Sequence, residues 1–207
     1  MIAKEGFPFV LGALAVFLIL VIFPVKLIIF LTAVFCGFCL WFFRDPERSI
    51  PAQKDVMVSP ADGKVIEVFN VELNGETVTK VSIFMNVFNV HVNRMPITGK
   101  ITSVKHVEGK FLPADRPDAS YENEQNVIEL ETERGNVTVK QIAGLIARRT
   151  VCYAKEGDML PIGDRLGIIK FSSRLEVFIP KGFDILIKNG DITKAGETIL
   201  AKYTGEA

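Results

Sequence analysis

The chain has 207 residues, and its 24 lysines and arginines balance 24 aspartates and glutamates, so the formal net charge is zero. This balance excludes a protein built around a strongly basic nucleic-acid surface, and no acidic tail stands out. The mean hydropathy of +0.30 is high for a water-soluble domain. The first 43 residues account for the excess, because 34 of them are apolar and only three are charged.

Two apolar runs at the N-terminus, residues 6–23 and 25–43, are separated by Pro24. Read as one helix, residues 6–43 would rise about 57 Å, whereas the hydrocarbon core of a bilayer is about 30 Å thick. The sequence therefore predicts a transmembrane helical hairpin that turns at residues 24–26. Residues 1–43 form the expected membrane anchor, and residues 44–207 form a separate domain. A re-entrant or interfacial helical pair is the alternative, because each run is close to the minimum spanning length.

The charges that flank the two runs predict an orientation. Lys4 precedes the first run, and Arg44, Arg48 and Lys54 follow the second, whereas only Lys26 marks the turn. Positively charged flanks stay on the cytoplasmic side of a membrane. We therefore expect both ends of the hairpin, and the domain that follows, on the cytoplasmic side of the cell membrane.

The domain 44–207 is predicted to be mostly β, with a sandwich or barrel-like fold. Short runs rich in β-branched residues alternate with Gly, Asn and Asp turn signals, and no long segment has helical periodicity. The expected strands are residues 65–69, 78–84, 101–107, 127–131, 137–142, 168–171, 175–179 and 185–187. The polar stretch 109–126 interrupts this pattern, and a loop of that length in a compact domain is often functional.

Few residues of the domain could carry chemistry. His91 precedes a Met-Pro turn, whereas His106 lies in an alternating run and is expected to be structural or exposed. Asp62 stands in a turn sequence. Ser172 and Ser173 interrupt an apolar strand, which is costly unless their hydroxyls have partners. The three cysteines and two histidines form no cluster with metal-ligand spacing, so no metal is expected. On local grounds alone, structural roles are favoured for both His91 and Asp62.

Several segments together resemble the short, pyruvoyl-dependent phosphatidylserine decarboxylase family along nearly the whole chain. Their order and spacing are more specific than any one of them. The segments are FFRDP at 42–46, SPADG at 59–63, FMNVFNVHVNR at 84–94, NEQN at 123–126, GLIARR at 144–149 and FSSR at 171–174. The resemblance implies a proenzyme that cleaves its own chain.

The resemblance also assigns roles to the candidate residues. It implies that Asp62 orients His91, that His91 is the general base, and that Ser173 is the nucleophile. Ser173 would attack the carbonyl carbon of Ser172, the chain would split between these two residues, and Ser173 would become a covalent pyruvoyl cofactor. These roles fit the chemistry of serine, because its hydroxyl is a weak nucleophile until an oriented base takes its proton.

The activity implied by the resemblance is decarboxylation of phosphatidylserine to phosphatidylethanolamine. The pyruvoyl group would act as the electron sink that pyridoxal phosphate provides in other enzymes. Arg148 and Arg149 could hold the lipid phosphate, or they could be a solvated pair. The expected partners are a phospholipid in the membrane and the chain's own cleaved fragments, 1–172 with 173–207. A second copy of the chain, forming a homodimer, is a possible partner, and no nucleic acid is expected.

Two positions depart from the family pattern. Ser172 stands where the family usually has glycine, which reaches backbone conformations closed to other residues. Arg94 stands where longer members have a second histidine, so the division of labour between processing and reprotonation is open. Two other functions also remain open. One is archaetidylserine decarboxylation, with an ether-lipid substrate. The other is a non-processing, membrane-tethered β module, because residues 161–167 are similar to a turn of lipoyl- or biotinyl-type carrier domains.

Overall fold

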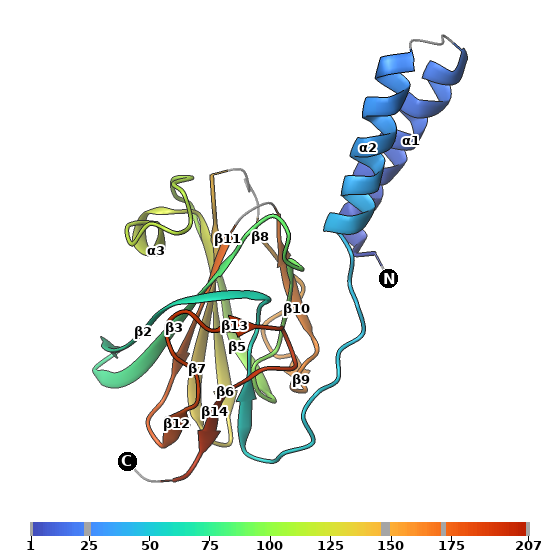
Figure 1. Cartoon of the computed structure of the whole chain (residues 1–207). Helices are drawn as coiled ribbons and strands as arrows, with labels where there is room; N and C mark the ends of the chain where they lie inside the picture. The colour runs from blue at the N-terminus through green and yellow to red at the C-terminus, as the bar shows by residue number, and fades with distance from the viewer. Residues whose placement is uncertain (1, 23–25, 146–149, 171–172, 206–207) are drawn as a thin grey trace. The chain divides into compact units, whose positions relative to one another are not determined.

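The first of two units in the chain, Met1–Glu47, is helical. The computed structural model describes residues 2–22, 26–145, 150–170 and 173–205. The 3-10 helix η1 (Lys4–Gly6) leads into α1 (Phe7–Ile22), and α2 (Lys26–Phe42) packs beside α1 (Figure 1). The ends of the pair are joined where the Ala3 N–H donates to the Phe43 carbonyl at 2.9 Å.

The two predicted apolar helices are present, but the transmembrane part of the prediction is not supported. Within the described ranges, no helix is long and apolar enough to cross a membrane. The physical reason is length: the 17 residues of α2 rise about 26 Å, less than the hydrocarbon thickness of about 30 Å. Residues 23–25, which hold most of the predicted turn, lie outside the described ranges.

The second unit, Arg48–Ala207, consists mainly of strands, which confirms the mostly β prediction. Among its described residues, the short helix α3 (Ala119–Glu122) is the one helix. The strands are β1 (Val56–Val58), β2 (Gly63–Leu73), β3 (Glu76–Met85), β4 (Val92–Arg94), β5 (Gly99–Val107), β6 (Gln125–Thr132), β7 (Gly135–Ala143), β8 (Thr150–Cys152), β9 (Met159–Leu160), β10 (Arg165–Ile169), β11 (Ser173–Ile179), β12 (Phe183–Ile185), β13 (Ile192–Thr193) and β14 (Ile199–Tyr203).

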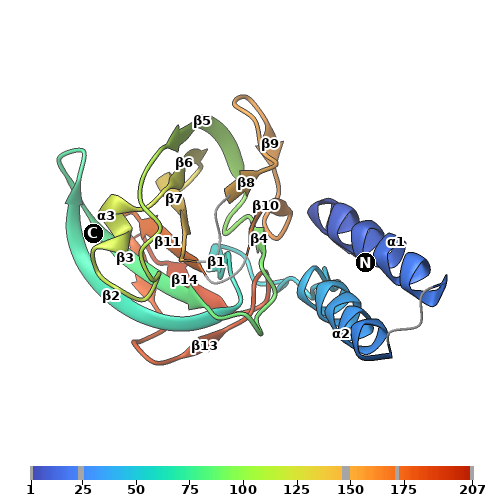
Figure 2. The ribbon, with the colours of Figure 1, turned by 90° about the horizontal axis from the view of Figure 1, so that it is seen from above.

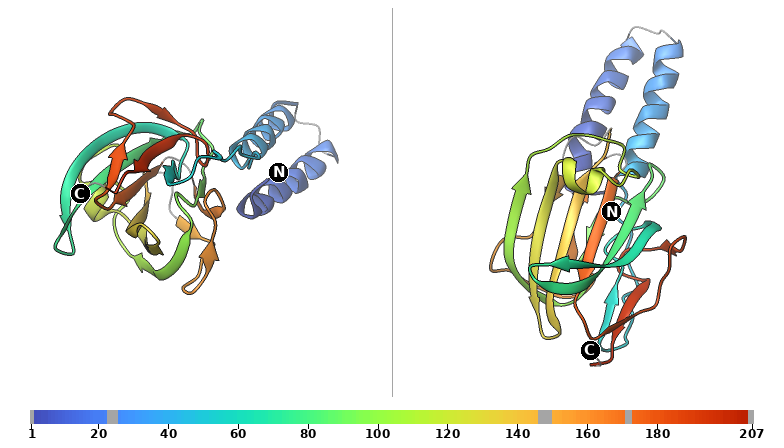
Figure 3. Two further views of the ribbon diagram at one scale, coloured as in Figure 1. Left: turned by 90° about the horizontal axis from the view of Figure 1, so that it is seen from below. Right: turned by 90° about the vertical axis from the view of Figure 1, so that its left-hand side faces the viewer.

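These strands form one large antiparallel sheet and two small ones. The large sheet has the order β13-β2-β3-β11-β7-β6-β5-β9, and the small sheets have the orders β1-β14-β12 and β4-β10-β8. Seen from above, the strands of this unit curl around a common interior, as expected for a barrel-like domain (Figure 2). Strands β5, β6, β7, β11 and β3 lie side by side in the right-hand view of Figure 3.

Strand β11 lies in the middle of the large sheet, between β3 and β7. Successive side chains of a strand point to opposite faces. Leu175, Val177 and Ile179 therefore point to the interior, where they belong to the hydrophobic core together with residues of β3 and β7. Arg174 and Glu176 point to the outer face, and both are fully buried.

Candidate active site

Two of the predicted site residues, Asp62 and Ser173, lie at the same end of the large sheet. Ser173 is the first residue of β11, and it pairs with Met85 at the end of β3 and with Ala143 at the end of β7. One position further along, Arg174 pairs with Phe84, which also pairs with Lys64 near the start of β2. Asp62 directly precedes β2, so Asp62 and Ser173 lie at the same end of the strands.

Ser173 is completely buried on the interior face of β11. Its Oγ makes no hydrogen bond to any residue that the structure describes. A buried hydroxyl without a partner is costly, and such a group in a folded protein calls for an explanation. Its two cross-strand neighbours, Met85 and Ala143, are apolar and fully buried. The two neighbouring strands therefore place apolar side chains on both sides of Ser173.

His91 is held in a defined orientation by the loop between β3 and β4. Its Nδ1 lies 3.0 Å from the carbonyl oxygen of Asn89. Because a carbonyl only accepts hydrogen bonds, this contact places the proton of the neutral ring on Nδ1 and leaves Nε2 as the unprotonated nitrogen, which is the form that acts as a base. The His91 carbonyl accepts a hydrogen bond from the N–H of Ile169 at 3.3 Å. His91 is therefore fastened to the end of β10, four residues before Ser173.

Asp62 is bound by groups other than the one expected from the sequence. The Arg48 Nη2 donates to both carboxylate oxygens, at 2.9 and 3.0 Å, and the Ala195 N–H donates to Oδ1 at 2.8 Å. Gly63 brings this turn close to β3, because a Cβ at Gly63 would lie 2.3 Å from the Phe84 carbonyl oxygen. The contacts of Asp62 thus order the turn that precedes β2. Its role in orienting His91 stays a prediction.

Three predicted site residues lie outside the described ranges: Ser172, Arg148 and Arg149. Their roles at the cleaved bond and at the lipid phosphate stay predictions. His106, expected to be structural or exposed, is exposed, and its Nδ1 lies 2.9 Å from Asn126 Oδ1.

A buried chain of amide side chains next to Ser173 was missed in the sequence. Asn126 Nδ2 donates to Gln141 Oε1 at 3.1 Å, and Gln141 Nε2 donates to Asn93 Oδ1 at 2.9 Å. Asn93 Nδ2 in turn lies 3.7 Å from the sulfur of Met85, the cross-strand partner of Ser173. This chain joins the large sheet to β4, the strand that follows His91. The available signal was a polar Gln141 at an interior position of a strand.

The polar stretch 109–126, predicted to be functional, contacts the same end of the sheet. Asn123 Nδ2 donates to the carbonyl oxygens of Leu112 and Ala143, at 2.8 and 2.7 Å. Asn123 is 1% exposed. The loop is thereby anchored to Ala143, the residue that pairs with Ser173 on β7.

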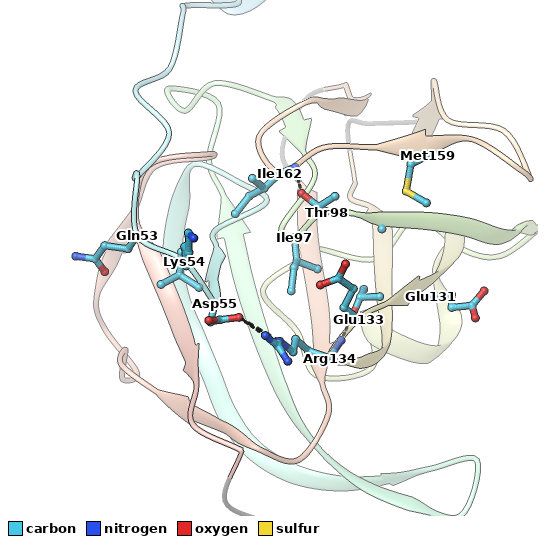
Figure 4. A pocket seen from close by; sticks show the side chains of 13 residues that line it. Gln53, Lys54, Asp55, Ile97, Thr98, Glu131, Glu133, Arg134, Met159 and Ile162 are labelled. Carbon is cyan, nitrogen blue, oxygen red and sulfur yellow. Dashed lines mark hydrogen bonds and ion pairs between the residues drawn. The ribbon is translucent and has the colours of Figure 1, made fainter.

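A cavity of about 510 Å³ lies at the opposite end of the large sheet (Figure 4). It is lined by the turn between β6 and β7 and by residues 53–56, and Asp55 and Arg134 form an ion pair in it at 2.7 Å. Ser173 pairs with the other end of β7, so the cavity is remote from the candidate residues. Among the described side chains, no group of three or more His, Cys, Asp or Glu is gathered to hold a metal ion.

Comparison with known proteins identifies the family. The family model for phosphatidylserine decarboxylase matches residues 35–201. A protein of Geobacter metallireducens named phosphatidylserine decarboxylase proenzyme is 48% identical, over 96% of this chain and 95% of its own length. Proteins of the same name from Magnetococcus marinus and Geotalea uraniireducens are 44% and 46% identical and are covered over 97% and 95% of their lengths. The chain belongs to the phosphatidylserine decarboxylase family.

Proposed function

We propose that the chain is a self-cleaving proenzyme whose mature form decarboxylates phosphatidylserine to phosphatidylethanolamine. The family and the proenzyme name of the relatives support this function. The observation that carries it is the buried Ser173 hydroxyl at the start of the central strand, which bonds to no described residue. A structural serine in this position would need a partner, whereas a reacting serine needs a base.

Cleavage begins when His91 Nε2 takes the proton of Ser173 Oγ. The freed oxygen attacks the carbonyl carbon of residue 172, and the peptide bond becomes an ester. Loss of the α-proton of residue 173 and breakage of its Cβ–Oγ bond then release residue 172 as a carboxylate and leave residue 173 as an enamine, which converts to its imine form. Water then releases the nitrogen of residue 173 as ammonia, and a pyruvoyl group remains at the new N-terminus. The Asn89 carbonyl contributes by holding the Nδ1 proton and thereby keeping Nε2 in the basic form.

The buried position of Ser173 also fits the pyruvoyl group that would replace it. That group supplies a carbonyl that accepts the electrons released when carbon dioxide leaves. Met85 and Ala143 exclude water from this position, and an apolar surrounding disfavours the charged carboxylate of the substrate. His91 can return a proton to the α-carbon. Arg148 and Arg149 are proposed to bind the lipid phosphate.

We further propose that the helical pair brings the enzyme to the membrane that contains its substrate, with the second unit on the cytoplasmic side. The support is exposed apolar surface on both helices: Leu18 is 59% exposed and Phe30 is 63% exposed. An apolar helical surface that rests in the lipid interface would bury these side chains. Leu145, which is 60% exposed, follows the end of β7 and could meet lipid beside the site.

The direct test is the intact mass of the purified protein with and without substitutions. We expect fragments 1–172 and 173–207, with the mass of the second showing a pyruvoyl N-terminus. His91→Ala and Ser173→Ala should leave the chain at full length, whereas His106→Ala should cleave normally. Vesicles that contain diacyl or ether-linked phosphoserine lipid then identify the substrate. Cleavage that persists in His91→Ala removes this residue from the mechanism, and a wild-type chain that never cleaves indicates a non-processing module.

A further inference from the structure

The proposed cut would create a chain end inside the sheet. Before cleavage, β11 is held on one side by seven residue pairs with β3 and on the other by six pairs with β7. After cleavage, Ser173 is a terminus between Met85 and Ala143. Strand ends fray unless they are tied down. The reactive group is at this end, so a small displacement of β11 would move it out of the site.

A buried set of charged and hydroxyl side chains lies on the outer face directly behind this end. We call it the ionic cluster, and it consists of Glu67, Lys80, Ser82, Ser120, Arg174 and Glu176. Two cations face two carboxylates, and all of these side chains except Glu67 are fully or almost fully buried. Burying ions is costly, and a buried ion pair is weak evidence of added stability. Because such a cluster adds little net stability, we look for its role in selecting one arrangement of the strands over others.

Arg174 contacts two neighbouring strands and one residue of its own strand. Its Nη2 bonds to a carboxylate oxygen of Glu67 on β2 and donates to Ser82 Oγ on β3 at 2.9 Å. Its Nε lies 2.8 Å from Oε1 of Glu176, which is two residues further along β11. The guanidinium group thereby links β11 to β2 across β3, at the residue directly after the proposed cut.

Glu176 joins the cluster to the loop 109–126. Its Oε1 lies 3.3 Å from Lys80 Nζ, and its Oε2 accepts a hydrogen bond from Ser120 Oγ at 2.9 Å. Ser120 belongs to α3, which lies over the outer face near β11 in the right-hand view of Figure 3. The stretch singled out in the sequence is thus fastened to the strand that would carry the new N-terminus.

The order of charges on β11 opposes every small slip of the strand. A slip by one residue would turn Arg174 and Glu176 into the hydrophobic core. A slip by two residues preserves the faces, so apolar alternation alone does not oppose it. In one direction, however, it would place Arg174 directly opposite Lys140 of β7, so that two cations face each other. In the other direction, it would put Phe178 in the buried position of Glu176 and take that carboxylate away from Lys80 and Ser120. The cluster therefore discriminates between registers that the core cannot distinguish.

We propose that the ionic cluster fixes the register of β11 and thereby positions residue 173 for self-cleavage and, afterwards, for catalysis. Arg174 and Glu176 are positioning residues, because they act through the strand and lie on the face opposite to Ser173. The proposal rests on the proposed function for the reaction that it serves. It assigns to the cluster and to α3 a role beyond general stability.

The test compares variants that weaken β11 from opposite faces. Arg174→Met removes the charge, and Arg174→Lys retains it. Val177→Ala weakens the same strand from the core face and serves as the stability control. We expect Arg174→Met to slow self-cleavage by about 10- to 100-fold, because a misplacement near 1 Å can cost that much. Arg174→Lys should recover most of the rate, and Val177→Ala should cleave like the wild type at a temperature where all variants are folded.

Glu176→Gln retains the shape of the side chain and replaces Arg174→Met if the latter does not fold. Hydrogen exchange of the β11 amides is measured in parallel, and the cluster variants should lose protection first at residues 173–176. Equal cleavage rates and equal exchange patterns in cluster and control variants would overturn the proposal. If no variant and not even the wild type cleaves, the proposed function fails, and the exchange pattern alone decides whether the cluster fixes the register.

Discussion

The residue before the proposed cleavage site is Ser172, where the family usually has glycine. For the oxygen of Ser173 to attack, the carbonyl of residue 172 must be reached from above its plane, which requires an unusual backbone conformation. Such conformations cost about 1–3 kcal/mol for a residue with a Cβ. We therefore predict that Ser172→Gly speeds cleavage by roughly 5- to 150-fold. A time course of freshly synthesised protein on a gel measures the rate.

The smaller product on the same gel shows which peptide bond was cleaved. Mass fragmentation of that product should place residue 173 at its N-terminus. A wild-type chain that is cut completely at once, with no gain from glycine, would show that the backbone strain is absent. A new terminus at residue 172 would show that Ser172 is the nucleophile.

The carboxylate of Asp62 carries the second prediction at this scale. Because Asp62 binds the nearly buried Arg48 through both oxygens, Asp62→Asn should lower the free energy of unfolding by about 1.5–3 kcal/mol. It should also slow cleavage. Denaturant titration of the uncleavable Ser173→Ala background measures the first effect. Arg48→Met separates the two roles: normal cleavage in this variant would mean that Asp62 acts on His91 directly, whereas slow cleavage would mean that it acts by ordering the turn.

The candidates at this scale could be found from residue types, but their contacts could not. The sequence could identify His91, Asp62 and Ser173 because their side chains can carry out acid-base or nucleophilic chemistry and stand in recognisable segments. The Asn89 contact of His91 uses a backbone carbonyl, which leaves no trace in the sequence. Gln141 could have been suspected only because it is polar at a position where the alternation of β7 points inward.

At the scale of elements, the contact between β2 and β11 makes the stability depend on pH. Burial alone raises the pKa of Glu67, but the charges of Arg174 and Lys80 and the hydrogen bonds from Lys80 and Ser82 outweigh it. The pKa therefore lies below the ordinary value of 4.5. A carboxyl whose pKa is lowered on folding stabilises the protein above the unfolded pKa, and this stabilisation is lost as the pH falls through the folded value.

We predict that Glu67→Gln destabilises the protein by a constant amount near neutral pH and by progressively less below pH 4.5. Urea midpoints from neutral pH down to about pH 3 measure the difference between variant and wild type. Glu129→Gln, on an exposed position of β6, is the control and should show no such trend. A difference that stays constant to the lowest pH would mean that Glu67 is not stabilised by its cationic neighbours.

Long strands were predicted well and short ones were not. Residues 65–69, 78–84, 101–107, 127–131, 137–142 and 175–179 all lie within observed strands, because alternation over five or more residues is a strong signal. Strands such as β4 and β8 have three residues each, too few for a period to appear. Together with β10, these short strands form the small sheet that follows His91. The sequence therefore did not predict this sheet beside the site.

At the scale of the whole molecule, the exposed apolar helices predict binding to lipid. We expect the protein to sediment with phospholipid vesicles and the double variant Leu18→Asp/Phe30→Asp to lose this binding. Burying each such side chain contributes about 1.5–3 kcal/mol, so binding should fall by well over tenfold. The control Ile192→Asp adds a charge at a 70% exposed position on β13 and should bind normally. Equal binding of all three proteins would remove the helices from membrane contact.

Composition predicted a boundary after residue 43, and the chain divides into two units after Glu47. The transmembrane part of the prediction for the first unit is not supported. The dense apolar run predicted helices, and helices are present. Whether a run spans a bilayer depends on the number of residues that remain helical in one piece, and the ends of both helices decide that number. The fold of the second unit, by contrast, follows from alternation and turn residues, which act locally.

The central position of β11 has a consequence for how the protein can fold. As a proenzyme, the chain threads β11 between β3 and β7 as part of one covalent molecule, and unfolding and refolding are unimolecular. Once the bond before Ser173 is cut, unfolding releases a second chain of 35 residues, and recovery requires two molecules to meet. The melting temperature of the mature protein then depends on its concentration, whereas that of the proenzyme does not. The cut thus turns an equilibrium fold into one preserved mainly by the slowness of its unfolding.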